Sequence, residues 1–172
     1  ILGQMAVALL ILVVYSGLGI AGLVAFALAD LVNPLTLVYL LVYFFIAFFT
    51  IASLMAAAGS AVNEMREAQT LITPVMMLMM LPWLLWMPIQ RAPNSSFATI
   101  ASFVPGVNPF VMAIRLGGSE PVPTWQIPAS MLVGLATVVF CGWAAAKVFR
   151  IGVLMYGKPP DFRTLVRWVR MA

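Results

Sequence analysis

The chain has 172 residues, of which 64% are hydrophobic and only 8% are charged, and its mean hydropathy is +1.09. A soluble domain is nearer half apolar and a quarter charged, so the composition excludes a soluble protein and indicates an integral membrane protein. The length fits a single transmembrane domain over residues 1–172. One cysteine and no histidine exclude an intramolecular disulfide, a Cys/His zinc site and a His-ligated haem within these residues.

Four segments are apolar and long enough to cross a bilayer, which takes about 20 residues. They are expected at about residues 5–29, 35–60, 71–89 and 125–149. Asp30, Asn33 and Pro34 predict a tight turn after the first span, and the polar stretch "AVNEMREAQT" connects the second span to the third. Pro74 and Pro82 are expected to kink or interrupt the third span. The opening "ILGQMAV" lacks an initiator methionine and a signal-peptide charge pattern, so we expect the C-terminal part of a longer polypeptide.

Between the third and fourth spans, at about residues 95–117, lie two apolar stretches of only eight residues each, Phe97–Val104 and Pro109–Leu116. Neither is long enough to span a bilayer. Residue types typical of helix ends and bends stand at the right places: Ser95 or Ser96 as the first cap, Asn108 with Pro109 as the second start, Gly117 as its end, and Pro105 with Gly106 between. The pattern predicts a re-entrant helical hairpin, and two helices lying flat at the interface are the alternative.

Basic residues predict the orientation, because cytoplasmic segments of membrane proteins are enriched in Lys and Arg. Most of them lie at the end of the fourth span and in the tail, residues 150–172: Lys147, Arg150, Lys158, Arg163, Arg167 and Arg170. We therefore expect the C-terminus in the cytoplasm and the hairpin on the outer side. The tail after Pro160 reads as a basic amphipathic helix, and its Arg163, Arg167, Trp168 and Arg170 are expected on an anionic membrane surface, with docking to a protein partner as the alternative.

Several signatures of chemistry are missing from the sequence. No Asp, Glu, Lys, Arg or His lies at mid-span, where an ion-coupled transporter would place one, and no paired acids, Ser/His pattern or metal-ligand spacing indicates an enzyme. "GVLMYGKPP" at residues 152–160 resembles most of a phosphate-binding loop, but Pro159 replaces the required Ser or Thr and the stretch follows a membrane span. Energy for transport is therefore expected from another protein. Four methionines of the third span favour packing over Cu(I) binding: Met76, Met77, Met79 and Met80.

Five stretches follow one another in an order that is specific as a set: "ILGQ", "AAAGSAVNEMREAQTLITPVMML", "ASFVPGVNPFVMAIRL", "VPTWQIPASML" and "AAKVFRIGVLMYGKPPDFRTLVRW". Together they resemble the C-terminal portion of type-2 ATP-binding-cassette (ABC) transporter permeases, especially the subgroup that includes the sodium-efflux permeases. Gln4 stands where Lys is commoner in the family. The resemblance implies six spans per permease, of which this chain would hold the last four.

The resemblance also implies a function. A multi-pass permease of the bacterial inner membrane would form an export path with a second, identical or different, permease half, embedded in membrane lipid. Separate cytoplasmic ATPase subunits would bind ATP and Mg²⁺, so this chain would hold no cofactor and no ATPase site of its own. Nucleic-acid binding is not expected beside so hydrophobic a chain. The alternative is a non-transporting membrane subunit that anchors or assembles a larger complex.

Two groups of site residues follow from this reading. Candidates for coupling to the ATPase are Gln4, Asn63, Glu64, Arg66 and Glu67. The last four lie in one loop, and the alternative is that this loop is only a solvated connector between two spans. Candidates for the outer hairpin and exit gate are Pro105, Asn108, Pro109 and Arg115. For Arg115, contact with lipid headgroups, pairing with Glu120 and a place on the exit path are all open from the sequence.

Overall fold

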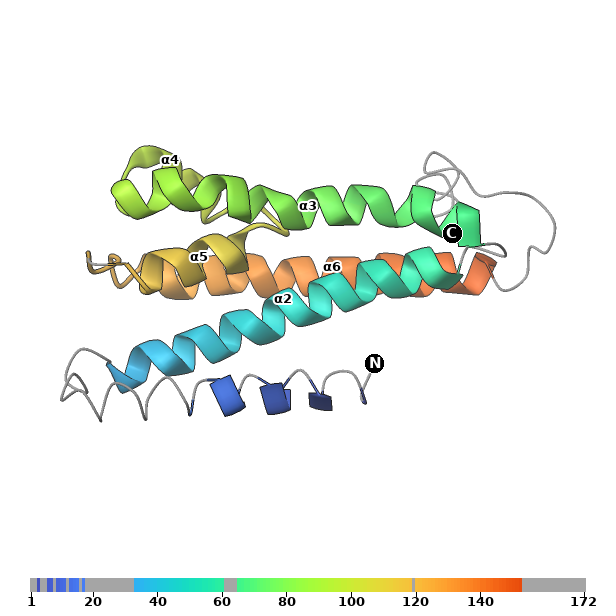
Figure 1. Ribbon diagram of the computed structural model, residues 1–172, viewed down its shortest axis with the longest axis horizontal. Helices are drawn as coiled ribbons and strands as arrows, with labels where there is room; N and C mark the ends of the chain where they lie inside the picture. Colours follow the sequence, from blue (N-terminus) through green and yellow to red (C-terminus); the bar gives the residue numbers. More distant parts are fainter. Residues whose placement is uncertain are drawn as a thin grey trace. The chain divides into compact units, whose positions relative to one another are not determined.

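A computed structural model of the chain describes residues 33–60, 65–118 and 120–152, with several positions between 3 and 17, and of residues 65–68 and 151–152 it describes the backbone only. The chain divides into two compact units, residues 1–41 and 42–172. The secondary-structure elements of the described residues are all helices, with no strand among them, as Figure 1 shows. The predicted all-α class is therefore confirmed.

In the first unit, the described positions between 3 and 17 are helical. Gln4 and most of the predicted span at 5–29 lie outside the described residues. Helix α2, Pro34–Ser60, begins in this unit directly after Asn33. The Asn33 side-chain oxygen accepts from the Leu35 amide at 2.9 Å, and proline occupies the first helical position, where a missing N–H costs nothing.

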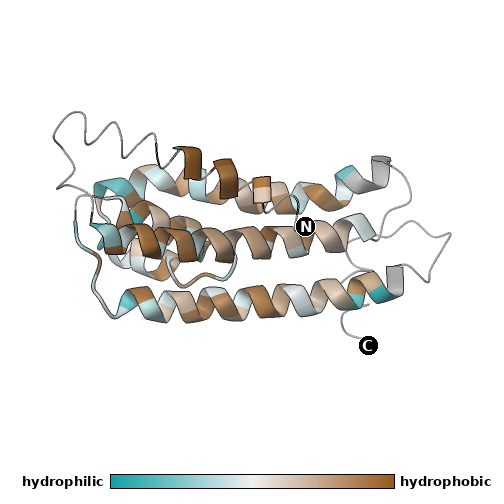
Figure 2. Ribbon diagram, turned by 90° about the horizontal axis from the view of Figure 1, so that it is seen from below, coloured by the Kyte–Doolittle hydropathy of each residue, from teal (hydrophilic) through white to brown (hydrophobic). Residues whose placement is uncertain are grey.

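Within the described residues, three helices are long and apolar enough to cross a membrane. They are α2, the Gln69–Arg91 part of α3 (Met65–Arg91), and the Gln126–Arg150 part of α6 (Gln126–Gly152). Figure 2 shows hydrophobic residues along the middle of the long helices and hydrophilic residues towards their ends. At most 17% of each apolar window is buried within the chain, so most of this surface faces outward.

Helix α3 begins earlier than predicted and is not interrupted. It runs as one helix through Pro74, Pro82 and Pro88, and it begins at Met65, so residues 65–70 of the expected polar loop form its first turns. A proline in a helix removes one N–H and so frees one carbonyl, and in this helix that loss does not end the helical run. Met76, Met77, Met79 and Met80 are 40–65% exposed, so their side chains make few packing contacts within the described part of the chain. The buried stripe of α3 runs instead through Leu71, Pro82 and Ile89.

The predicted hairpin contains helices α4, Ser96–Ala101, and α5, Asn108–Leu116. Ser95 caps α4, because its hydroxyl accepts from the Ala98 amide at 3.2 Å. Helix α4 ends three residues before the predicted Val104, and turns carry the chain to α5. Gly117 ends α5 as predicted, though with an ordinary right-handed φ of −85°.

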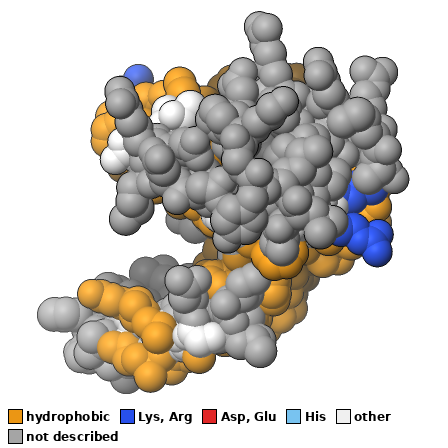
Figure 3. All heavy atoms as spheres, turned by 90° about the vertical axis from the view of Figure 1, so that its right-hand side faces the viewer, with side chains coloured by type: hydrophobic (Ala, Val, Ile, Leu, Met, Phe, Trp, Pro, Cys, Tyr) orange, Lys and Arg blue, Asp and Glu red, His pale blue; other side chains and the backbone are white. Residues whose placement is uncertain are grey.

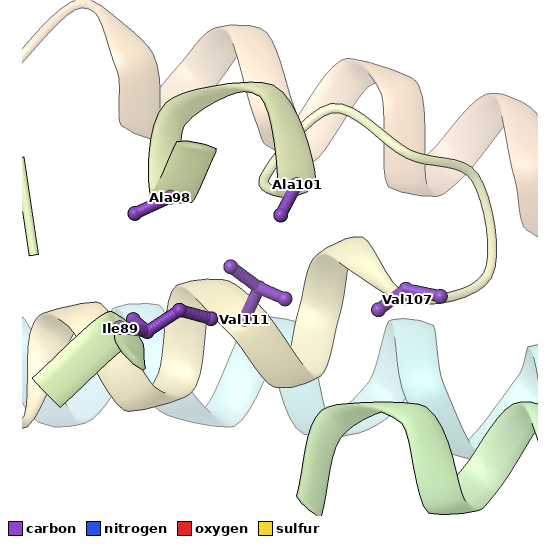
Figure 4. Close-up of a cluster of buried hydrophobic side chains, with 5 residues drawn as sticks. All are labelled: Ile89, Ala98, Ala101, Val107 and Val111. Atoms are coloured by element: carbon purple, nitrogen blue, oxygen red, sulfur yellow. The ribbon is translucent and has the colours of Figure 1, made fainter. Parts of the chain in front are cut away.

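The hairpin packs on α3 through a small hydrophobic core. Five buried side chains from three helices and one turn point towards one another in Figure 4: Ile89, Ala98, Ala101, Val107 and Val111. Leu78, Leu85 and Ile114 pack against them from the side. Helix α5 contacts both α3 and α6, and α4 contacts α3 and α5. The two short helices therefore pack against the long helices α3 and α6.

Helices α2 and α6 meet along a seam of small and polar residues. The Tyr43 hydroxyl of α2 donates to the Ile127 carbonyl of α6 at 3.0 Å. About two turns further along α6, a Cβ on Gly134 would lie only 2.8 Å from Ile46 Cγ2, which leaves no room for a side chain there. The glycine therefore lets the Ile46 side chain of α2 lie directly against the α6 backbone.

The bend between α4 and α5 depends on Gly106, whose φ is +85°. Residues other than glycine rarely adopt this backbone region, so we expect Gly106→Ala to destabilise the protein by about 1–2 kcal/mol. Gly117→Ala is the matched control, since its φ is negative and its added Cβ would make an ordinary 3.5 Å contact with the Ala113 carbonyl. Thermal unfolding of both purified variants checks this, and equal Tm values would contradict it.

Candidate functional site: buried polar clusters beside the hairpin

Arg115 lies in the last turn of α5 and none of its side chain is exposed. The inward face of α5 also carries Asn108, Val111 and Met112, at the i, i+3, i+4 and i+7 spacing of one helix face. An arginine is almost never fully buried unless it is paired. Its partners therefore determine what it does.

The Arg115 guanidinium meets one acceptor for each of its five N–H groups. The contacts are Nε to the Pro93 carbonyl at 2.7 Å, Nη1 to Ser102 Oγ at 2.8 Å and Met112 Sδ at 3.8 Å, and Nη2 to Gln126 Oε1 at 2.8 Å and Asn94 Oδ1 at 3.2 Å. We call Pro93, Asn94, Ser102, Arg115 and Gln126 the arginine cluster. It ties the chain after α3, the end of α4, helix α5 and the start of α6 to a single side chain.

The electrostatics of the arginine cluster are unusual because all of these acceptors are uncharged. Burial lowers the pKa of the Arg115 guanidinium, since desolvation disfavours its charged form. An arginine nevertheless stays protonated at physiological pH, because its ordinary pKa lies far above that pH. The cluster therefore stabilises a buried positive charge with oriented dipoles. With every N–H already used, Arg115 positions the hairpin and has no N–H left for a transported anion.

Asn94 links this charge to a carboxylate at the surface. Its Oδ1 accepts from Arg115, while its Nδ2 donates to Glu120 Oε2 at 3.1 Å and to the Pro121 carbonyl at 3.3 Å. The reverse amide orientation would place N–H groups against the guanidinium, so the network fixes this one. Arg115 and Glu120, considered as a pair from the sequence, are thus connected through one amide.

A second group, which we call the hydroxyl cluster, joins α2, α5 and α6 and contains Tyr43, Asn108, Ile127 and Ser130. The Tyr43 and Ser130 hydroxyls form a short hydrogen bond with each other, and both lie 3.0 Å from the Ile127 carbonyl. Asn108 Nδ2 donates to the Ser130 carbonyl at 2.8 Å. Asn108 Oδ1 is fully buried and has no hydrogen-bond partner.

Asn108 begins α5 and Pro109 follows it, as the sequence predicts. The capping position before them is Val107, which has no side-chain cap. The Asn108 side chain is turned away from its own helix towards α6, where it donates to the Ser130 carbonyl. The side chain of Asn108 therefore makes a tertiary hydrogen bond and leaves the end of its own helix uncapped.

The other predicted site residues are spread out. Pro105 is exposed in the bend, Pro109 is buried at the start of α5, and Asn108 and Arg115 belong to different clusters. Arg66 and Glu67 lie in the first turns of α3, where only the backbone is described. Eight further expectations lie outside the described residues: Gln4, Asn63, Glu64, Arg163, Arg167, Trp168, Arg170 and the "GVLMYGKPP" stretch beyond Gly152.

Sequence reasoning missed most members of both clusters. Tyr43 and Ser130 each lie in an apolar span without a motif around them, and Asn94, Ser102 and Gln126 each look like ordinary loop or helix-end residues. One signal was available, because the spacing of Asn108, Val111, Met112 and Arg115 places the arginine on the inward face of α5. No local pattern indicates which acceptors would meet it there.

Comparisons with known proteins agree with this architecture. A model of the ABC-2 family transporter proteins matches residues 1–147. A curated relative from Bacillus subtilis strain 168, called uncharacterized protein YhaP, is 30% identical over 141 residues, which is 82% of this chain and 33% of the relative. Uncharacterized protein MJ1024 of Methanocaldococcus jannaschii is 26% identical over 130 residues, 76% of this chain and 32% of that protein. No solved structure matches.

The fold defines a class, which is a helical membrane protein. Its described residues contain three candidate spans and a helical hairpin packed on them. With the match over residues 1–147, the chain belongs to the ABC-2 family of transporter membrane proteins. The family's membrane subunits are permeases that generally work with ABC ATPases. The chain spans about a third of the length of the curated relatives that it matches.

Proposed function

We propose that this chain forms part of the permease of an ATP-driven exporter, in which two permease halves surround a path and separate cytoplasmic ATPase subunits supply energy. The observation that carries the proposal is the outward-facing apolar surface of α2, α3 and α6, of which at most 17% per window is buried within the chain. Helices this exposed need lipid and further helices around them. A second permease half and the remaining length seen in the relatives would supply these helices.

The proposed topology has four spans, the first at about 5–29, with the C-terminus in the cytoplasm of a bacterial inner membrane. Lys147 and Arg150 in the last turns of α6 support this orientation. Lys147 Nζ lies 4.2 Å from the centre of the Trp143 ring, an arrangement that suits the membrane interface. Figure 3 looks onto this end of the molecule and shows Lys and Arg side chains beside hydrophobic ones.

The hairpin would then lie on the outer side, as a re-entrant part of the exit gate that includes Pro105, Asn108, Pro109 and Arg115. Support comes from its construction: two helices too short to span, packed on α3 and held by one buried charge. A gate must move as one body, and the arginine cluster provides the rigid connection. The tail with Arg163, Arg167, Trp168 and Arg170 would lie on the cytoplasmic membrane surface.

Coupling to the ATPase is proposed at the beginning of α3, with Asn63, Glu64, Arg66 and Glu67, and at Gln4. The test compares Arg66→Glu with Arg91→Glu in the full-length protein, purified from its membrane in mild detergent. Both are arginines on α3, and about 37 Å of helix separates them at 1.5 Å per residue. The wild type is expected to bring down a stoichiometric ATPase with a complete phosphate-binding loop. Arg66→Glu should weaken that association about tenfold, which corresponds to about 1.4 kcal/mol, and Arg91→Glu should not.

The same experiment separates the two candidate functions. Equal recovery of the ATPase with both variants would contradict a coupling role for the start of α3. Recovery of a large assembly without any ABC ATPase would overturn the permease proposal and support an anchoring subunit instead.

A further inference from the structure

The hydroxyl cluster contains an acceptor that the described chain leaves without a donor. Asn108 Oδ1 is buried, and the whole residue is 0% exposed. Its amide is not free to turn over, because Nδ2 donates to the Ser130 carbonyl and the reverse orientation would place two oxygens together. Buried polar groups in proteins nearly always have a partner, so each exception calls for an explanation.

The neighbouring backbone cannot supply the missing donor. The Asn108 amide donates to the Val104 carbonyl at 2.9 Å, and Pro109 has no N–H. The next two amides of α5, at Phe110 and Val111, both donate to the Val107 carbonyl, at 3.1 and 3.2 Å. The first turn of α5 is therefore already satisfied.

The neighbouring hydroxyls cannot supply it either. Tyr43 and Ser130 carry one hydroxyl proton each, and the two hydroxyls share the Ile127 carbonyl as an acceptor. Whichever hydroxyl donates to the carbonyl, the other donates to its partner hydroxyl, so both protons are used within the pair. The pair keeps free lone pairs and can accept a further hydrogen bond, as Asn108 Oδ1 can.

We infer that the junction of α2, α5 and α6 is a binding site for a small hydrogen-bond donor, with Asn108 Oδ1 as its principal acceptor and the Tyr43–Ser130 hydroxyl pair beside it. The ligand is an O–H or N–H group, because both positions offer acceptors and neither offers a proton. A buried water has this chemistry, and so does a hydroxyl or amine of a transported molecule. The site stands on the hydrogen-bond geometry alone, whereas its use by a transported molecule rests on the proposed function.

The test is a map of the complete permease at a resolution that shows ordered water, recorded from two preparations. One is washed in detergent, transferred to nanodiscs of synthetic phosphatidylcholine and kept without ATP, so that water is the probe. The other is extracted with its native lipid. A water-sized peak within hydrogen-bond distance of Asn108 Oδ1 in both preparations identifies water as the donor. A larger feature in the native preparation alone identifies a bound molecule.

An empty site in both maps, with ordered water visible elsewhere in the same bundle, would overturn the inference. The variant Asn108→Leu gives a second measurement, because leucine has a similar shape and no acceptor. It is expected to lower Tm, since it loses the bound donor as well as the hydrogen bond to Ser130. Ser130→Ala is the comparison, because it removes one hydroxyl and leaves both Asn108 oxygen and nitrogen in place. An Asn108→Leu protein as stable as wild type would contradict an occupied site. Failure of the permease proposal would change neither the map at Asn108 nor the Tm of the variants.

Discussion

Arg115→Met is expected to cost about 3–5 kcal/mol of stability, the range found when a buried charged partner is removed and its contacts are left unpaired. Methionine nearly matches the length of the arginine stem but offers no donor. The Pro93 carbonyl, Ser102 Oγ and Gln126 Oε1 would each lose a hydrogen bond of 2.7–2.8 Å. The variant also removes the desolvation cost of a buried charge, which opposes this loss of stability. Several acceptors left without a donor, at about 1–3 kcal/mol each, outweigh that gain.

Two further variants decide whether the geometry or only the charge matters. Arg115→Lys keeps the charge but replaces a planar five-donor fork by a compact ammonium group, so we expect it to recover little of the loss. Arg91→Met is the matched control at the end of α3, where the arginine is exposed and its one described contact is Met87 Sδ at 3.8 Å. The control should stay within about 0.5 kcal/mol of wild type. Thermal unfolding of the full-length protein in detergent measures all three variants. Equal Tm shifts for Arg115→Met and Arg91→Met would refute a stabilising role for the arginine cluster.

Gly134→Ala is expected to force α2 and α6 apart at a cost of about 1–3 kcal/mol, which is typical of overpacking. The added Cβ would lie 2.8 Å from Ile46 Cγ2 and 3.1 Å from Asn108 Nδ2. Ile46 is a buried β-branched residue on a helix, so its Cγ2 cannot turn aside. The variant would therefore disturb the seam between α2 and α6 and the hydroxyl cluster together.

Gly142→Ala is the control on the same helix. Its Cβ would lie 3.9 Å from Ser53 Oγ, an ordinary contact, and alanine favours a helix over glycine by about 0.8–1 kcal/mol. We expect it to be neutral or slightly stabilising. Ile46→Ala combined with Gly134→Ala should be less damaging than the sum of the two single changes, because the small side chain makes room for the new methyl group. Additive losses in that double-mutant cycle would show that the clash is not the cause.

The two predictions concern one mechanical question, which is how the hairpin is attached to the long helices. The arginine cluster holds one end of α5 to the start of α6 and to the chain after α3, and Asn108 holds the other end to α6. Both attachments are polar and both are buried. In the proposed exporter, this arrangement would make α5 and the beginning of α6 move together.

Much of the helical layout could be predicted from local sequence. A run of apolar residues that is long enough to span a bilayer has few alternatives to a helix, because its backbone must satisfy its own hydrogen bonds. The start of α2 followed from Asn33 and Pro34, the cap of α4 from Ser95, and the bend from Pro105 and Gly106. Each of these depends on a residue and its neighbours within about four positions. For Pro74 and Pro82 the sequence left open a kink or an interruption, and α3 continues through both as one helix.

The sequence by itself determined that this is an all-helical membrane protein, where its helices lie and where its hairpin turns, because apolar length, caps and turn residues act locally. Only the tertiary structure decided what Arg115, Asn108 and Gly134 do. The partners of Arg115 are up to 22 positions away, and Tyr43 meets Ser130 across 87 positions. Such contacts depend on how each helix is rotated and how closely its neighbours approach. Those quantities are set by the packing of all the helices together, and no single segment contains them.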